Sequence, residues 1–269
     1  MPDFHIAAFS DAANLCGGTS LRWPMDDSNL KIRTKDQYRL SHSHWAGLNL
    51  AQHVEDEYHQ VLRNRELFES SLKMPSKPFW LNQVHGTELV KVSADRVLAH
   101  EHNIPMADGS YSFDKKVVLA VMTADCLPIL MSSINNDWIG AIHCGWRSLA
   151  GGIITKLLNK APVAPSHIKV WLGPAISQKH FQVGEDVRQA FLPYFSDDDC
   201  LQEIFTPDPN YANKYFADLY VLAKMQLTMA GVLNVSGGEY CTYSNPEKFY
   251  SYRRQKKTGR MLTFIWMKS

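Results

Sequence analysis

Three short segments place metal-competent side chains where an apolar run gives way to a turn. They centre on His85, on Cys126, which interrupts an apolar run, and on His143, which ends another. One thiolate and two imidazoles match the three protein ligands of a catalytic zinc with an open fourth position, and such ligands also suit copper. The spacings of 41 and 17 residues mean that only the fold can assemble this site. The residues therefore predict a metal site, with zinc as the expected ion and copper as the alternative.

Each of these residues also has a plainer interpretation. Taken alone, His85 fits a turn, Cys126 a small buried side chain and His143 the end of a strand. Cys126 and His143 would also suit a cysteine hydrolase, in which Cys126 is the nucleophile and His143 its base, acting on an amide or an amino-acid-linked cell-wall precursor. Asp125 precedes Cys126 in an otherwise apolar stretch. Because a buried polar group is costly unless it is paired or bound, this break in the run favours a site over a plain core segment.

A basic segment near the end of the chain is the candidate for binding an anion. It carries five cations within eight residues, from Arg253 to Arg260, and aromatic residues precede it. Guanidinium groups bind phosphate through paired hydrogen bonds. Arg147, in the turn after His143, is a second candidate. The alternatives are a solvated basic hairpin turn and, for Arg147, an ordinary surface position.

The residues around these segments predict the elements that must hold them. Continuous apolar and β-branched runs predict buried strands at 117–123, 127–132, 138–143 and 168–172. Shorter strands are expected at 79–84, 88–92, 250–254 and 261–267. Amphipathic patterns predict helices at 56–72, 151–159, 183–195 and 218–230. Strands and helices that alternate without regular β–α–β order favour a mixed α/β fold over a doubly wound parallel sheet.

The composition limits the class of protein. At 269 residues the chain can bury a full core, and no linker or repeat divides it, so we expect a single domain over 1–269 with an irregular N-terminal segment, 1–44. A net charge of +1 excludes a strong global field for nucleic acid or an acidic membrane surface. Five cysteines without a C-x-x-C pair, no signal sequence and no uninterrupted apolar span predict a cytoplasmic protein without a disulfide frame. No heptad pattern requires a dimer, and we expect a monomer.

At these same residues the chain resembles the YfiH-type proteins, also called laccase-domain or polyphenol-oxidase-like proteins, over roughly residues 45–269. The matching stretches are Gly47-Leu48-Asn49-Leu50, Asn82-Gln83-Val84-His85-Gly86, Thr123-Ala124-Asp125-Cys126-Leu127-Pro128, His143-Cys144-Gly145-Trp146-Arg147, Leu172-Gly173-Pro174-Ala175-Ile176, Phe181-Gln182-Val183-Gly184, Cys241-Thr242-Tyr243, Phe249-Tyr250-Ser251-Tyr252-Arg253-Arg254 and Thr258-Gly259-Arg260.

The resemblance implies a single α/β/β/α layered domain with mixed β-sheets. It also implies a metal, mostly zinc, held by His85, Cys126 and His143. Family members are described as purine nucleoside enzymes, which implies phosphorolysis of adenosine, inosine and methylthioadenosine and deamination of adenosine. Purine nucleosides and phosphate are then the expected partners. Copper-dependent phenol oxidation and peptidoglycan editing have also been attributed to the family.

Within this implied activity, Cys126 and Asp125 are the candidate catalytic residues. Asp125 is the candidate proton shuttle, Arg147 and Arg254 are candidates for holding phosphate, and Asn49 is a candidate substrate ligand. A multicopper laccase is not expected, because the chain lacks the Cys-His-x₃-His-x₄-Met stretch of a blue-copper site.

The chain departs from the family pattern in three places. Asn14-Leu15-Cys16 stands before Gly17 where the family has an Arg, Cys144 stands where it often has Ala, and Ser148 where it has Gly.

Overall fold

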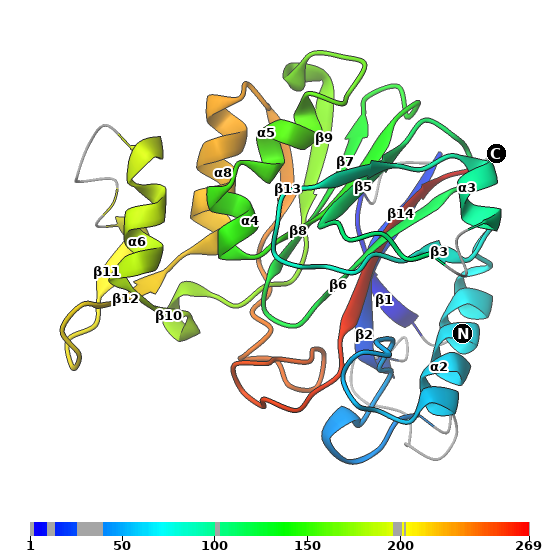
Figure 1. Ribbon diagram of the computed structural model, residues 1–269, viewed down its shortest axis with the longest axis horizontal. Coiled ribbons are helices and arrows are strands. Elements are labelled where there is room, and N and C mark those ends of the chain that lie inside the picture. The colour runs from blue at the N-terminus through cyan, green and yellow to red at the C-terminus, as the bar shows by residue number, and fades with distance from the viewer. Residues whose placement is uncertain are drawn as a thin grey trace.

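The computed structural model describes residues 3–9, 14–25, 40–99, 103–195, 201 and 203–268, and its strands in these ranges form three sheets (Figure 1). The first has the order β1-β2-β14-β6-β3, comprising β1 (Asp3–Ala7), β2 (Leu15–Met25), β14 (Met261–Met267), β6 (Val118–Thr123) and β3 (Pro78–Phe79). The second has the order β13-β9-β7-β8-β5-β4, comprising β13 (Asn234–Gly237), β9 (Ile168–Leu172), β7 (Leu127–Ser133), β8 (Ile139–Cys144), β5 (Gly109–Ser112) and β4 (Leu89–Lys91). The third is small, with β10 (Gln182–Gly184), β12 (Lys214–Ala217) and β11 (Phe205–Pro207).

The first two sheets pack face to face and bury side chains that alternate along each strand. On β6, Leu119 and Val121 face the space between the sheets, where they join Leu130 of β7 and Ala141 of β8. The intervening residues of β6 face outward. Because successive side chains of a strand point to opposite faces, a strand that is apolar at every position can fill two cores at once.

Helices cover the outer faces of this double sheet, α2 on one side and α4, α5 and α8 on the other (Figure 1). Helix α2 (Tyr58–Leu72) packs Phe68 against Phe264 of β14, with ring centroids 5.5 Å apart. The opposite layer is formed by α4 (Trp146–Ala150), α5 (Ile153–Leu158) and α8 (Leu219–Met229). Helices α3 (Ala94–Leu98) and α6 (Glu185–Phe191) lie outside these layers. The predicted α/β/β/α arrangement with mixed sheets is confirmed.

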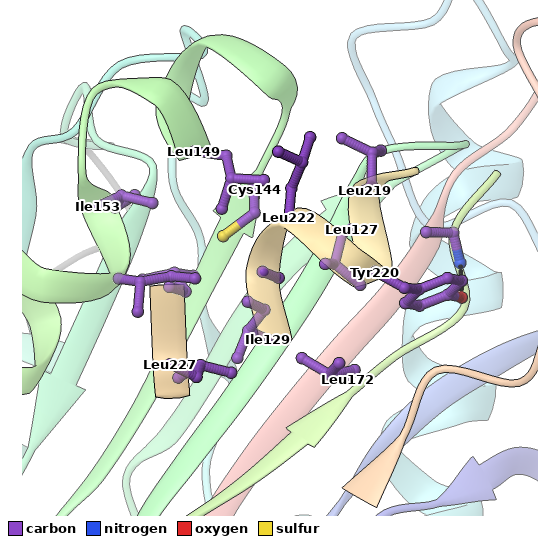
Figure 2. Close-up of a cluster of buried hydrophobic side chains, with 14 of the residues drawn as sticks. Leu127, Ile129, Cys144, Leu149, Ile153, Leu172, Leu219, Tyr220, Leu222 and Leu227 are labelled. Carbon is purple, nitrogen blue, oxygen red and sulfur yellow. Dashed lines mark hydrogen bonds between the residues drawn. The ribbon is translucent and has the colours of Figure 1, made fainter. Parts of the chain in front are cut away.

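The helical layer also settles the position of Cys144. Its thiol lies among Leu127, Leu149 and Leu222 (Figure 2). Because side chains alternate along a strand, it points to the face of β8 opposite to that of its neighbour His143. The side chain is fully buried, and burial raises the pKa of the Cys144 thiol well above its ordinary value. Cys144 is therefore a small apolar side chain of the core.

Most predicted elements are present, with shifted ends. The predicted helix 56–72 begins at Tyr58, and helix 218–230 has Asp218 as its N-cap, whose carboxylate accepts hydrogen bonds from two backbone N–H groups. Helix 151–159 shortens to α5, and helix 183–195 to α6, because β10 occupies 182–184. The strand predicted at 79–84 is only the two-residue β3.

Two predictions are wrong. The segment 1–44 is not irregular throughout, since β2 lies between β1 and β14 in the first sheet. Gly18 suggested a loop, but it lies within β2. Only glycine fits at this position, because a Cβ there would lie 2.1 Å from the Ile6 carbonyl oxygen of β1. Residues 1–2, 10–13 and 26–39 of this segment lie outside the described residues.

The second error is the strand predicted at 250–254, which is a loop. Tyr250 is fully buried and its hydroxyl donates a hydrogen bond to the Trp45 carbonyl at 2.8 Å. The Arg253 N–H donates to the Asp125 carboxylate at 2.6 Å. Hydrogen bonds that involve side chains therefore hold this segment in place of the backbone hydrogen bonds that a neighbouring strand would supply. In the described ranges, no helix has the length and apolar character needed to cross a membrane.

Candidate active site

The fold brings His85, Cys126 and His143 together. One ligand atom from each of the three lies within 4.8 Å of the others. The Sγ atom of Cys126 is 3.8 Å from Nε2 of His85, and the rings of His85 and His143 meet edge to face with centroids 4.7 Å apart. His143 is buried, Cys126 is half-buried and His85 is exposed, so the cluster is closed at the back and open toward solvent.

Strand register explains why residues so distant in sequence meet. Strands β7 and β8 are antiparallel with Leu127 opposite Cys144, which sets Cys126, just before β7, beside the end of β8. His143 is the penultimate residue of β8 and pairs with Pro128 of β7. Its side chain therefore points to the same face of the sheet as that of Cys126. The loop carrying His85 is held against β6 by Gln83, whose side-chain amide accepts a hydrogen bond from the Met122 N–H and donates one to its carbonyl.

Asp108 connects two of these three side chains, and the sequence did not single it out. It is fully buried just before β5, and one carboxylate oxygen, Oδ1, accepts hydrogen bonds from His143 Nδ1 at 2.8 Å and from the His85 N–H at 2.9 Å. The other oxygen, Oδ2, accepts from the N–H groups of Val84 at 3.2 Å and Gly86 at 2.6 Å. The only local signal was a carboxylate between Ala107 and Gly109, which resembles an ordinary turn.

Three backbone donors and one imidazole therefore converge on a single carboxylate. Burial alone would raise the pKa of the Asp108 carboxyl, but the hydrogen bonds from His143 and from the Gly86 and Val84 N–H groups outweigh it, and the pKa is lowered. The hydrogen bond at Nδ1 fixes the orientation of the His143 ring and leaves Nε2 for the cluster. Histidines that bind metals are commonly held by a carboxylate in this way.

The cluster is strongly polarised. Burial would raise the pKa of the Cys126 thiol, but the field of His143 and hydrogen bonds from both histidines lower it to about 6. Burial would lower the pKa of His143, yet Cys126 and then Asp108 raise it to about 9. Without a metal, the pair is a thiolate and an imidazolium at neutral pH.

These residues fit a divalent transition metal. The thiolate and two imidazoles are its preferred donors, and an exposed side remains for a fourth ligand. Gly145 adds a second observation, since a Cβ at this position would lie 2.7 Å from Cδ2 of His85 and 3.4 Å from Sγ of Cys126. The absence of a side chain at Gly145 keeps the cluster clear.

A cavity of about 510 Å³ opens in front of the cluster. This volume lies within the range of small-molecule pockets. Its walls combine apolar, polar and cationic side chains, and no Asp or Glu is among them: His53, Leu81, Asn82, Gln83, His85, Met122, Thr123, Ala124, Cys126, His143, Tyr252 and Arg260.

Asp125 does not line this cavity. One of its carboxylate oxygens accepts a hydrogen bond from the Thr242 hydroxyl and the other from the Arg253 N–H, both at 2.6 Å. The residue is nearly buried, with a φ of +96°, a left-handed conformation that a non-glycine residue adopts only when its surroundings hold it there. The geometry corrects the predicted proton shuttle, because Asp125 binds the β6–β7 turn to the C-terminal loop.

Asn49 also holds structure in place. It is fully buried, its Oδ1 accepts hydrogen bonds from the Ala51 and Arg260 N–H groups, and its Nδ2 donates to the Asp56 carboxylate. The prediction that Asn49 contacts substrate is corrected on the same ground, since every polar atom of its side chain has a protein partner. Its effect on the cavity is to position Arg260.

The two arginines predicted to hold phosphate lie elsewhere. Arg147 is exposed and its guanidinium stacks 4.3 Å over the Trp146 ring, outside the cavity. Arg254 donates hydrogen bonds to the carbonyls of Thr242, Tyr243 and Phe249 at 2.7–2.8 Å. A guanidinium bonded to three carbonyls has little capacity left for an anion, which corrects the prediction for Arg254. Stacking leaves the N–H donors of Arg147 free, so phosphate binding by Arg147 stays a prediction, at a position outside the cavity lining.

Comparison with known proteins places the chain among close relatives. A family model described as multi-copper polyphenol oxidoreductase laccase matches residues 31–268. A Shigella flexneri protein named purine nucleoside phosphorylase YfiH is 37% identical over 246 residues, covering 91% of this chain and 97% of the relative. The protein of the same name from Escherichia coli K12 is 40% identical over 220 residues, covering 82% and 86%.

Solved structures agree with these sequence matches. The crystal structure of a Neisseria meningitidis protein superposes with a TM-score of 0.83 at 34% identity, covering 99% of this chain and 100% of that one. YlmD from Geobacillus stearothermophilus superposes with a TM-score of 0.82 at 27% identity over the full length of both chains.

Proposed function

The chain belongs to the multi-copper polyphenol oxidoreductase laccase family, to which its YfiH-type motifs pointed, and from that premise we propose that it is a metal-dependent purine nucleoside phosphorylase. The names of the relatives support the reaction. The observation on this chain that carries the proposal is the His85, Cys126 and His143 cluster at the wall of a nucleoside-sized cavity. Adenosine, inosine and methylthioadenosine are the proposed substrates.

The proposed cofactor is zinc, held by His85, Cys126 and His143. When bound, zinc would supply a Lewis acid at the cavity wall. Asp108 would keep His143 in the tautomer that presents Nε2. Leu81 and Met122 would provide apolar surface for the purine, and the cavity walls would exclude bulk water from it.

In phosphorolysis, a phosphate oxygen forms a bond to ribose C1′ as the bond from C1′ to the purine nitrogen breaks. The electron pair of that bond leaves with the base, which takes up a proton, and the products are the free purine and ribose 1-phosphate. No redox change occurs. The protein must therefore hold a nucleoside and an oxyanion in one cavity, in contact distance of each other.

Adenosine deamination is the second activity proposed for the same cavity, and the geometry favours it less. Deamination needs a group that shuttles protons between water and the leaving ammonia. No carboxylate is among the lining residues, and both oxygens of Asp125 and of Asp108 are already bonded. This arrangement supports phosphorolysis as the main reaction.

One assay separates these reactions. Metal-loaded protein is incubated with adenosine, with and without phosphate, and the products are resolved by chromatography. Phosphorolysis predicts adenine and ribose 1-phosphate only when phosphate is present, whereas deamination predicts inosine in both samples. The phosphate-containing sample is repeated with inosine and with methylthioadenosine. Absence of turnover on all three nucleosides, or full turnover by Cys126→Ala, would contradict the proposal.

The lowered pKa of Cys126 beside His143 favours one further candidate, a Cys/His hydrolase that acts on a peptidoglycan precursor. Alkylation by iodoacetamide distinguishes the two. A metal-bound Cys126 is protected until a chelator removes the metal, whereas a free nucleophile reacts at the same rate with and without chelator.

Metal analysis of protein that has not been exposed to added metal decides between zinc and copper. The described residues hold one cluster of three or more metal-competent side chains, which suits a single ion. Stoichiometric zinc is the expected result. Stoichiometric copper would instead favour phenol oxidation, the chemistry in the family's description.

A further inference from the structure

We propose that Arg260, together with His53, forms the binding subsite for inorganic phosphate in the cavity that contains the metal cluster. The proposal rests on the proposed phosphorolysis and assigns the oxyanion to residues other than Arg147 and Arg254. Both proposed residues line the cavity.

The register of the first sheet places Arg260 near the metal cluster. Arg260 immediately precedes β14, whose first residue, Met261, lies opposite Thr123, the last residue of β6. Cys126 follows β6 by three residues, so Arg260 and Cys126 lie at the same end of the sheet. An anion held by Arg260 would therefore lie at the same end of the cavity as the metal cluster.

The Arg260 side chain is fixed in direction. The backbone N–H of Arg260 donates to Asn49 Oδ1 at 3.0 Å, and the side-chain Nη1 donates to the carbonyls of Thr258 and Gly259 at 2.9 and 3.0 Å. One side of the guanidinium is therefore anchored, and its Nε and Nη2 donors remain for a ligand. A guanidinium offers paired, nearly parallel donors that match the oxygens of a phosphate.

Arg260 also forms no ion pair with a carboxylate among the described residues. In the ranges that the structure describes, no acidic residue lines the cavity either. Burial lowers the pKa of the guanidinium, and only Cys126, Asp125 and Tyr252 act against that effect. A half-buried cation that faces an open cavity without a carboxylate is a site whose charge an anion would balance.

Two other arginines of the same region are held by carbonyl groups or an aromatic ring of the protein. Arg254 is bonded to three carbonyls, and Arg65 lies 3.6 Å over the Trp80 ring and donates to the Leu50 carbonyl. Neither lines the cavity. Of these three guanidinium groups, only that of Arg260 lines the cavity.

His53 supplies a second group on the same wall. Burial lowers its pKa, and the nearby cations Arg260 and Arg65 lower it further. The ring therefore lies in the positive field of two guanidinium groups. A neutral imidazole can donate a hydrogen bond from one ring nitrogen, and this field favours an anion beside it.

The test compares KM for phosphate with KM for inosine in Arg260→Met and His53→Ala, with Arg260→Lys as the variant that keeps the charge. Arg63→Met, on the exposed face of α2, is the matched control. Arg260→Met is expected to raise the phosphate KM by about 10- to 100-fold, the range for loss of charge-assisted hydrogen bonds, and the inosine KM by less than about threefold. Arg260→Lys is expected to fall between Arg260→Met and the wild type. Unchanged phosphate KM in Arg260→Met, or an equal rise in both KM values, would overturn the assignment.

A binding measurement makes the subsite testable without turnover. Inorganic phosphate is titrated into metal-loaded wild type, Arg260→Met and Arg63→Met by calorimetry, with metal content and circular dichroism checked for each. Binding that is lost only in Arg260→Met supports the subsite even if no nucleoside is cleaved. Turnover with an unaltered phosphate affinity in Arg260→Met leaves the phosphorylase proposal standing and removes the subsite.

Discussion

Replacing Asp108 with Asn tests the carboxylate that connects the metal cluster to its supporting loop. Asp108 accepts four hydrogen bonds, two at each oxygen. In Asp108→Asn one oxygen becomes an NH₂ group, which cannot accept a hydrogen bond. Whichever way the amide is turned, two of these four donors lose their partner. His143 also loses the negative charge that orients its ring.

Two magnitudes follow from this geometry. Because Asp108 is fully buried, removing its charge from a bonded pair is expected to lower the free energy of unfolding by about 3–5 kcal/mol. Because it holds His143 through Nδ1, zinc affinity is expected to fall by about 10- to 100-fold. Asp114→Asn is the matched control, since Asp114 accepts a single exposed hydrogen bond from the Ala94 N–H.

The assay measures both quantities separately. Zinc affinity is obtained by competition with a chromophoric chelator, and the free energy of unfolding by urea denaturation of the metal-free protein. A zinc affinity of folded Asp108→Asn within about threefold of the wild type would refute the positioning role. An effect of the same size in Asp114→Asn would show that the change is not specific to the cluster.

Three further predictions concern other parts of the site. The stability of the metal-free protein is expected to depend little on this pair between about pH 6 and pH 9: the contribution of Cys126, whose folded pKa is lowered to about 6, grows as pH rises through this range, and that of His143, whose folded pKa is raised to about 9, declines by a similar amount. In Cys126→Ala the urea midpoints should instead fall relative to the wild type as pH rises, because Asp108 still raises the His143 pKa and nothing offsets the loss of that contribution; equal pH profiles would contradict this. Gly145→Ala is expected to weaken zinc binding by roughly 10-fold in the chelator competition, because the new methyl group displaces His85; an unchanged affinity would mean that the ring moves freely. Arg254→Met is expected to lower the free energy of unfolding by about 2–4 kcal/mol in urea, since three carbonyls lose their donor, and a change below about 0.5 kcal/mol would contradict that role.

The buried strands could be predicted from the sequence because their residues are apolar at every position. The predicted strands at 117–123, 127–132 and 138–143 agree with β6, β7 and β8 within a residue or two. Strand β2 was missed for the opposite reason. Gly17 and Gly18 look like turn residues, but Gly18 is needed because the Ile6 carbonyl oxygen of the neighbouring strand leaves no room for a Cβ, and a Cβ at Gly17 would be in tight contact with the Phe264 carbonyl oxygen.

Polar loops were harder to predict, because their conformation depends on distant partners. The strand expected at 250–254 is instead a loop whose backbone is bonded to Asp125, a residue more than a hundred positions earlier in the chain. The roles of the arginines also depend on partners that are distant in the sequence, so they could not be predicted. Arg254 and Arg260 lie six residues apart in one basic segment, and no local pattern distinguishes the one that supports the loop from the one that faces the cavity.

The sequence by itself determined which chemistry is available. A thiol and two imidazoles, each at the edge of an apolar strand, are properties of His85, Cys126 and His143 and of their immediate neighbours. The tertiary structure alone decided which other groups reach them. Asp108 lies beside His143 because β5 pairs with β8, and Arg260 lies near Cys126 because β14 pairs with β6. Strand register sets the distances between residues far apart in the chain, and such distances depend on long-range packing that no local pattern encodes.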